Sequence, residues 1–201
     1  MKLYDISQEV FSCSVYPGDP APEQSSLCRI ANGDLYNLTA FQMCAHNGTH
    51  LDAPFHFYAD GKTVERLALE ACIGVCFVAE HAGELTGTDA ASLLELARQA
   101  HPEAADRILV KGDILVTEDA ARVFADAGIL LLGVESQSVG PEDAPMAVHK
   151  ILLGAEVVLL EGLRLDAVSS GIYLLSAAPL NLAGCDGAPC RAVLMELPLS
   201  L

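Results

Sequence analysis

The sequence predicts one α/β domain over residues 1–201, in which helices cover a mixed β-sheet. Three observations support this fold class. Short apolar segments alternate with amphipathic segments in the middle of the chain, strand-like segments lie at both ends, and no repeat or long linker divides the sequence. Hydrophobic residues make up 52% of the chain and charged residues only 19%, which is ample material for a large core.

The first third of the chain is predicted to form strands and loops. We expect strands at 3–7 and 25–30, separated by the Pro/Gly loop YPGDPAP at 16–22. A further strand at 35–46 is expected to run directly into AHNGTHLDAPFHF at 45–57, which contains three of the six histidines. The histidines would then lie at the end of a strand.

The rest of the chain alternates strands and helices, which is typical of a mixed sheet covered by helices. The helices are predicted at 88–100, where Thr88 or Asp89 would cap the first turn, at 117–128, where Thr117 would do so, and at 144–156. The strands are predicted at 75–81, 107–112, 129–135, 157–165, 172–180 and 191–199. The order of these strands in the sheet does not follow from the sequence.

Charge and composition exclude several classes of partner. The formal net charge of −16 argues against nucleic acid, whose phosphates would be repelled, and against a basic membrane-binding surface. No apolar run is long enough to span a bilayer, and the N-terminus lacks the apolar region of a secretion signal. The seven cysteines contain no CxxC pair and are expected to be small buried hydrophobes in a reducing cytoplasm.

The histidine-rich stretch has the composition of a metal site. His46 and His50 are four residues apart, Asp52 follows two residues later, and His56 follows four after that. Imidazole nitrogen and carboxylate oxygen are the usual protein ligands of zinc, manganese and iron. A histidine pair at this spacing also occurs on helix faces without a metal, so the pair alone leaves both interpretations open.

The residues between the ligand candidates favour the metal site. Asn47-Gly48 is a turn signal, and Pro54 stiffens the end of the stretch. A tight bend there would turn several side chains toward one point. Histidine and aspartate side chains on a rigid bend are what a coordination site requires.

The stretch also resembles a family signature. Residues 46–56 match every fixed position of H-x-G-T-H-x-D-A-P-x-H, the signature of the cyclase family of metal-dependent hydrolases. That family includes bacterial kynurenine formamidases (arylformamidases) and isatin hydrolases. Weaker similarity at 16–20, 128–139 and 184–197 extends the resemblance over nearly the whole chain. It implies the family's fold, a swivelling β/α/β domain whose mixed sheet is partly barrel-like.

The resemblance further implies two divalent metal ions per chain, with zinc as the first candidate and manganese as the second. His149 and Glu161 are twelve residues apart, which is the spacing of the family's second metal pair. A carboxylate that follows four apolar residues, as Glu161 does, is costly to bury unless it is paired or binds a cation. By resemblance, His46, His50 and Asp52 bind one metal, and Asp52, His149 and Glu161 bind the other, with the two carboxylates bridging.

Two further residues are assigned by the resemblance. His56 lies outside the ligand set and is expected to act as general acid and base; a fifth ligand, or a partner of one, is the alternative. The loop at 16–20 resembles a loop on the substrate side, where kynurenine formamidases carry a tryptophan that stacks on the substrate. This chain has no tryptophan and carries Tyr16 there, whose ring can also stack. Thr49 and Asp186 are expected to form turns, and a contact that supports a metal ligand is the alternative for both.

The implied function is hydrolysis of a C–N bond in a small amide, formamide or cyclic amide by a metal-activated water. Two alternatives stay open: a lactone or ester hydrolase or cyclase at the same site, and a metal- or ligand-binding module without catalysis. The expected partner is a small carbonyl compound, with no nucleic acid and no membrane. The resemblance also suggests a homodimer or homotetramer, with which the high apolar fraction is compatible.

Overall fold

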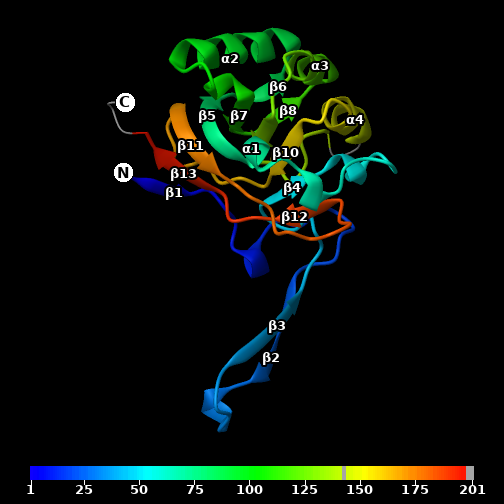
Figure 1. The fold of residues 1–201 in the computed structure, drawn as a ribbon, viewed down its shortest axis with the longest axis vertical. Helices are drawn as coiled ribbons and strands as arrows, with labels where there is room; N and C mark the ends of the chain where they lie inside the picture. The colour runs from blue at the N-terminus through cyan, green and yellow to red at the C-terminus, as the bar shows by residue number, and fades with distance from the viewer. Residues whose placement is uncertain (142–143, 198–201) are drawn as a thin grey trace.

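The main sheet of the fold contains nine strands. The computed structural model describes residues 1–141 and 144–197. The nine strands are β1 (Leu3–Asp5), β4 (His50–Asp52), β5 (Ile73–Glu80), β7 (Arg107–Lys111), β9 (Leu131–Val134), β10 (Val158–Glu161), β11 (Gly171–Ser176), β12 (Gly187–Pro189) and β13 (Val193–Glu196). Their order is β1-β13-β11-β5-β7-β9-β10-β4-β12, and the sheet curls into a half-barrel (Figure 1). The predicted α/β class and mixed sheet are confirmed.

Parallel and antiparallel pairs occupy different parts of this sheet. The neighbours β5, β7, β9 and β10 pair in parallel, and all the outer neighbours pair antiparallel. Parallel neighbours need a crossover connection, and helices supply it here. The helices are α1 (Leu69–Cys72), α2 (Gly87–Ala100), α3 (Glu118–Asp126) and α4 (Met146–Gly154). In Figure 1, α2, α3 and α4 all lie on one side of the sheet.

The helix ends follow from local hydrogen bonds. Thr117 caps α3 as predicted, because its side chain accepts a hydrogen bond from the backbone of Ala120. The predicted cap of α2 is wrong by two to three residues. The helix begins earlier because Thr86 and Asp89 form a reciprocal capping box, in which each side chain accepts from the other's backbone N–H. Asp89 is therefore the third residue of the helix.

Both faces of the central strands are buried. Along β7, Ile108 and Val110 pack toward the helices, whereas Leu109 packs into a second core on the other face. Along β10, Leu159 faces the helices and Leu160 faces the second core. Strands covered on both faces have continuous apolar sequences, which is why they were the easiest strands to predict.

Several short elements were not predicted. A small parallel sheet pairs β6 (Gly83–Leu85) with β8 (Ile114–Val116). The 3-10 helices are η1 (Val10–Ser12), η2 (Ile30–Asn32), η3 (Pro54–His56), η4 (Val64–Arg66) and η5 (Ala104–Asp106). Residues 198–199 of the predicted last strand lie outside the described residues. In the part of the chain that the structure describes, no helix is long and apolar enough to cross a membrane.

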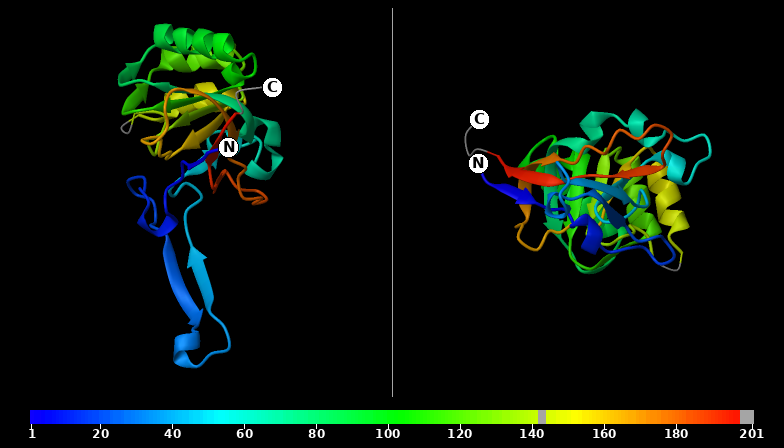
Figure 2. Two further views of the ribbon diagram at one scale, coloured as in Figure 1. Left: turned by 90° about the vertical axis from the view of Figure 1, so that its left-hand side faces the viewer. Right: turned by 90° about the horizontal axis from the view of Figure 1, so that it is seen from below.

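A two-stranded hairpin extends away from the main body. It pairs β2 (Glu23–Cys28) with β3 (Leu38–Gln42), and Figures 1 and 2 show it extending beyond the rest of the molecule. The predicted strand at 35–46 therefore stops at Gln42 and does not run into the histidine-rich stretch. That stretch instead contains a strand of its own, β4, which lies in the main sheet.

Candidate metal centre and active site

The register of three antiparallel strands assembles the candidate metal centre. β4 pairs with β10 on one side and with β12 on the other, so that His50 lies opposite Glu161 and Asp52 lies opposite Gly187. Side chains two residues apart in a strand point to the same face. His50 and Asp52 therefore share one face with Glu161, while Leu51 between them points into the second core.

Five side chains meet on that face. His50 Nε2 lies 3.3 Å from Asp52 Oδ1 and 3.3 Å from Glu161 Oε2. His149, from α4, places its Nε2 3.4 Å from Glu161 Oε1 and 3.7 Å from Asp52 Oδ2. His46 Nδ1 lies 2.8 Å from Asp52 Oδ1. The structure thus brings together all five residues that the sequence analysis assigned to metal binding.

The donor set fits divalent metal ions. The ligand atoms of His46, His50 and Asp52 lie within 4.8 Å of one another, and so do those of Asp52, His149 and Glu161. Asp52 belongs to both groups, as a bridging carboxylate would. Zinc, manganese and iron all accept imidazole nitrogen together with carboxylate oxygen.

The electrostatics of the cluster also fit bound cations. The side chains of Asp52 and Glu161 are only 1% and 3% exposed. Among residues 1–141 and 144–197, their ion-pair partners are histidines and no lysine or arginine. Two carboxylates this close are costly to bury without positive charge beside them. Divalent cations would supply that charge.

The pKa values of the histidines in the metal-free chain reflect the same carboxylates. Burial by itself lowers the pKa of His46, but hydrogen bonds with Asp186 and Asp52 outweigh it and raise this pKa to about 11. For His50, burial is likewise outweighed by Asp52 and Glu161, which raise the pKa to about 9. Burial favours the neutral acid of Asp52, yet its hydrogen bonds with His46 and His50 hold its pKa well below the usual value. The cluster is built to hold positive charge.

Two backbone carbonyls orient the buried histidines. His50 Nδ1 donates to the carbonyl of Gly48 at 3.0 Å, and His149 Nδ1 donates to the carbonyl of Pro145 at 2.8 Å. With the proton on Nδ1, each ring presents Nε2 to the carboxylates. Hydrogen bonds of this kind fix the tautomer and the ring orientation of metal-binding histidines.

The predicted bend is present and is held from three sides. Gly48 has a φ of 68°, a left-handed conformation that favours glycine. The hydroxyl of Thr49 donates to the carbonyl of Gly162 at 2.7 Å and accepts from the backbone N–H of Gln8 at 2.9 Å. Gln137 Nε2 donates to the carbonyl of Gly48 at 2.7 Å. Thr49 thus supports the bend as predicted, by tying it to the residue after β10.

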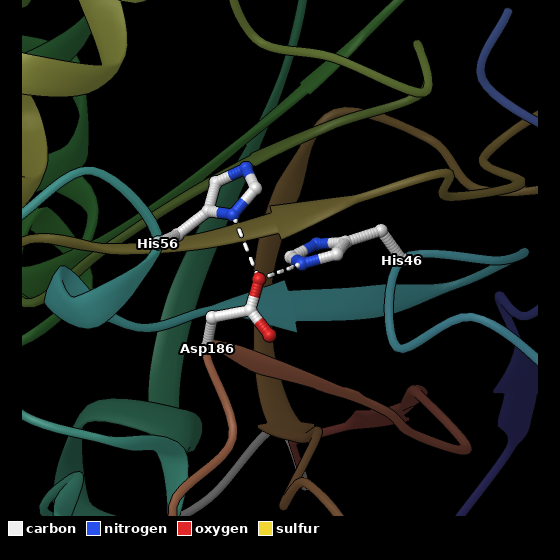
Figure 3. A group of neighbouring side chains, drawn as sticks. All are labelled: His46, His56 and Asp186. Carbon is white, nitrogen blue, oxygen red and sulfur yellow. Dashed lines mark hydrogen bonds and ion pairs between the residues drawn. The ribbon is translucent and has the colours of Figure 1, made fainter. Parts of the chain in front are cut away.

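His56 lies beside the five-residue cluster, and with His46 and Asp186 it forms a third group whose possible ligand atoms lie within 4.8 Å of one another. Its Nδ1 is 3.0 Å from Asp186 Oδ2, and the same oxygen is 2.8 Å from His46 Nε2 (Figure 3). The side chains of His56 and Asp186 are 28% and 39% exposed, compared with 13% for His46 and at most 4% for the other four clustered residues. The turn-forming role predicted for Asp186 therefore does not account for its main contacts, because its carboxylate forms hydrogen bonds with both His46 and His56. Its position just before β12, which pairs with β4, was not readable from the sequence.

A cavity of about 370 Å³ opens onto both groups. The lining includes all seven residues that the sequence analysis selected, Tyr16 among them. Sequence reasoning assigned no individual role to six further lining residues: Asp19, Cys44, Phe57, Gln137, Ser138 and Pro145. Phe57 stacks on His149 with ring centroids 4.8 Å apart, and Gln137 holds the bend. A small molecule in this cavity would meet the tyrosine ring, the metal ligands and His56 together.

Comparisons with known proteins agree with this geometry. The model of the Cyclase family matches residues 4–141, which is more than half of the chain. The chain belongs to the cyclase family. It is 33% identical to a kynurenine formamidase of Erythrobacter litoralis over 98% of this chain and 95% of that protein. A kynurenine formamidase of Salinibacter ruber is also 33% identical, over 98% of this chain and 99% of that protein.

Solved structures share the whole fold of this cyclase-family chain. A protein described as a potential metal-dependent hydrolase with cyclase activity is 30% identical, with a TM-score of 0.80 over 98% of this chain and 99% of its own. Isatin hydrolase A of Labrenzia aggregata, solved with benzyl benzoate bound, has a TM-score of 0.79 at 21% identity, over 96% of this chain and 93% of its own. The latter likeness concerns the fold alone.

Proposed function

We propose that this cyclase-family protein is a metal-dependent hydrolase that cleaves a C–N bond in a small amide, formamide or cyclic amide. The observation that carries the proposal is the pairing of a buried histidine–carboxylate cluster with a half-exposed histidine, His56, on one cavity. The curated relatives named kynurenine formamidase support amide hydrolysis. Across nearly its full length the chain also resembles a potential metal-dependent hydrolase.

Two divalent ions, zinc first and manganese as the alternative, are part of the proposal. His46, His50 and Asp52 would hold one ion, and Asp52, His149 and Glu161 the other, as the two ligand groups support. When bound, such ions lower the pKa of water and polarise a carbonyl group. The chain's own contribution is to hold the ligands by the carbonyls of Gly48 and Pro145, so that they need no reorganisation.

His56 is proposed as the general acid and base. With its Nδ1 proton donated to Asp186, its Nε2 is free to accept a proton, and Figure 3 shows this second nitrogen turned away from Asp186. The oxygen of the attacking water joins the carbonyl carbon, and the proton that His56 removes from the water returns to the leaving nitrogen as the C–N bond breaks. The Asp186 carboxylate stabilises the imidazolium between these two transfers.

Tyr16 is proposed to bind the substrate. It lines the cavity that contains His56, and a phenol ring stacks on flat substrates while its hydroxyl remains polar. We further propose one domain over residues 1–201, a homodimer or homotetramer, and a cytoplasmic location. All seven cysteines are free, which supports a reducing compartment.

The His56→Ala substitution tests the catalytic proposal. We expect the variant to keep the metal content of the wild type, because His56 belongs to neither of the two three-residue groups that are proposed to hold the ions. Its kcat/KM should fall by ~10²–10⁴-fold, the usual contribution of a general acid–base group. Metal content is measured by elemental analysis, and activity with a panel of amides and lactones that includes N-formylkynurenine.

Two outcomes would contradict the proposal. Unchanged hydrolysis by His56→Ala would remove the proton-transfer role. Inactivity of the fully metallated wild type toward the whole panel would favour a binding module without catalysis. The Gln99→Ala variant, altered on the exposed side of α2, is the matched control and should behave as the wild type.

A further inference from the structure

A third set of possible metal ligands lies beside the two groups that are proposed to hold the catalytic ions. His46, His56 and Asp186 offer ligand atoms within 4.8 Å of one another, and we call these three residues the outer triad. Asp186 Oδ2 lies 2.8 Å from His46 Nε2 and 3.0 Å from His56 Nδ1, so both rings turn a nitrogen toward the same oxygen (Figure 3). Two imidazole nitrogens and a carboxylate oxygen are donors that zinc accepts. The outer triad therefore has the composition and the spacing of a metal site.

The backbone holds the outer triad in place. Asp186 lies just before β12, and its carbonyl accepts a hydrogen bond from the backbone N–H of Ala53 at 2.9 Å. The carbonyl of Ala53 in turn accepts from the backbone N–H of His56 at 2.9 Å. His46 approaches from the other side of the bend at Gly48, and its ring centroid lies 4.2 Å from that of His56. Side chains positioned in this way can bind an ion with little rearrangement, which favours binding.

Two members of the outer triad are open to solvent. The side chains of His56 and Asp186 are 28% and 39% exposed, and all three residues line the cavity of about 370 Å³. An ion that enters the cavity can therefore reach them, and water can fill its remaining position, as in zinc sites with three protein ligands. An exposed carboxylate gains less from a cation than a buried one, because water already stabilises it. We therefore expect the outer triad to bind metal more weakly than the buried cluster and to fill last.

His46 can serve both the buried cluster and the outer triad. Its Nδ1 lies 2.8 Å from Asp52 Oδ1, and its Nε2 lies 2.8 Å from Asp186 Oδ2. When Nδ1 binds the first proposed ion, Nε2 still faces the outer triad. Coordination through Nε2 as well requires the ring to lose its remaining proton to solvent, since metal binding releases protons from its ligands. The outer triad can therefore be filled without removing a ligand from the buried ions.

We propose that the outer triad binds a third divalent ion when metal is in excess, and that this ion inhibits the enzyme. The inference rests on the proposed function, in which His56 accepts a proton on Nε2 while its Nδ1 proton is donated to Asp186. An ion on Nδ1 displaces that proton, which passes through solvent to Nε2. This second nitrogen, turned away from Asp186 in Figure 3, then carries a proton and can no longer accept one from water. The third ion thus removes the general base.

Zinc should be a stronger inhibitor than manganese. The affinity of nitrogen and oxygen ligands for divalent first-row metals is lowest for manganese and higher for zinc. Two of the three donors of the outer triad are imidazole nitrogens, which suit zinc, whereas manganese is better suited by carboxylate, carbonyl and water oxygen. Excess zinc should therefore inhibit at a lower concentration than excess manganese.

Ion counts at equilibrium test the site without reference to activity. The full-length enzyme, loaded with two ions per chain, is dialysed against a series of micromolar zinc concentrations, and bound zinc is measured by elemental analysis. We expect a saturable third ion per chain in the wild type. His56→Ala and Asp186→Asn should each keep two ions, which shows that the buried cluster is intact, and should lose the third. His81→Ala removes a histidine that does not line the cavity, so it is the matched control and should bind the third ion.

Activity should follow the occupancy of the third ion. With the amide that the enzyme hydrolyses best, saturating zinc should lower kcat of the wild type by at least ~10²-fold, the lower end of what a general acid–base group contributes. Half of this loss should occur at the zinc concentration that half-fills the third site. Asp186→Asn retains part of its activity, and that part should be far less sensitive to excess zinc. Manganese should cause the same inhibition only at a higher concentration.

Three results would overturn the inference. The outer triad is not a metal site if the wild type binds no third ion, or if His56→Ala and Asp186→Asn bind it as well as the wild type does. In the latter case the ion lies elsewhere on this acidic chain. A third ion that binds and leaves kcat unchanged would overturn the inhibition. Inactivity toward every amide would contradict the proposed function and the inhibition, while the ion counts, which need no turnover, would still decide whether the outer triad binds metal.

Discussion

Two groups of histidines and carboxylates lie side by side at the end of β4, and burial separates them. Asp52 and His50 have side chains that are 1% exposed, whereas Asp186 and His56 have side chains that are 39% and 28% exposed. Buried carboxylates whose ion-pair partners are only histidines gain from a cation that offsets their desolvation. A half-exposed pair can exchange protons with a ligand in the cavity. This difference in exposure supports the proposal that one group binds metal ions and the other transfers protons.

The largest effect is expected at the carboxylate that both ligand groups share. The Asp52→Asn substitution keeps the shape of the side chain and removes its charge, so both metal sites should fail together. We expect less than one metal ion per chain by elemental analysis and a loss of kcat/KM of at least ~10³-fold. The surface variant Asp113→Asn is the control. An Asp52→Asn protein that retained two ions would contradict the proposal that the buried group binds the metal ions through Asp52.

A smaller effect is expected at Asp186, the carboxylate of the exposed group. The Asp186→Asn substitution should lower kcat by ~10–100-fold with little change in KM, because Asp186 positions His56 without holding the substrate. Metal content should stay at the wild-type value. Kinetics and elemental analysis of the same preparations measure these quantities.

A double-mutant cycle separates two routes by which Asp186 could act, since it contacts both His56 and His46. If Asp186 acts through His56, adding Asp186→Asn to a His56→Ala protein should cost almost nothing further. If it acts through the metal ligand His46, the loss should persist in that background and the metal content should fall. The second result would mean that Asp186 acts together with the proposed metal ligands, so that the two groups of residues do not have separate roles.

The same contrast explains what the sequence could predict. His46, His50, Asp52 and His56 lie within eleven residues, so their spacing was enough to select them. His149 and Glu161 were found only through a family spacing, because neither has a polar neighbour in the sequence that points to a metal. Asp186 lies in a bend, but its contact with His56 was not predicted because it depends on β12 pairing with β4, and strand order was not available.

The strand predictions were limited in the same way by contacts that the sequence does not show. The buried central strands were predicted because burial on both faces leaves continuous apolar sequences. β4 was missed because His50 and Asp52 face a polar site, which disguises the strand pattern. The two strands of the β2–β3 hairpin were predicted at 25–30 and 35–46, but nothing in their apolar residues says whether they pack on the same chain. A local sequence pattern predicts a strand. Only tertiary or quaternary contacts determine which strand or surface it packs against.

The smallest effect concerns the metal-free cluster and its dependence on pH. His46 and His50 have pKa values raised to about 11 and about 9 in the folded chain, above the ~6.5 of an unfolded histidine. A raised pKa stabilises the fold fully below pH ~6.5, and this stability is lost as pH rises through about 9 and then about 11. Bound metal ions would displace these protons, so the metallated protein should not show this loss.

Thermal unfolding between pH 6.5 and 10, with and without metal, tests this dependence. The metal-free protein should lose at least ~2–4 °C of its midpoint relative to the metallated one, the shift expected for 1 kcal/mol in a domain of this size. A metal-free His46→Ala, His50→Ala variant is the reference, because it keeps every other titrating group and should lose less over the same range. Equal decreases in the unfolding midpoint of the two metal-free proteins would mean that His46 and His50 do not hold protons in place of metal ions. The buried group would then differ from the His56–Asp186 pair only in its exposure to solvent.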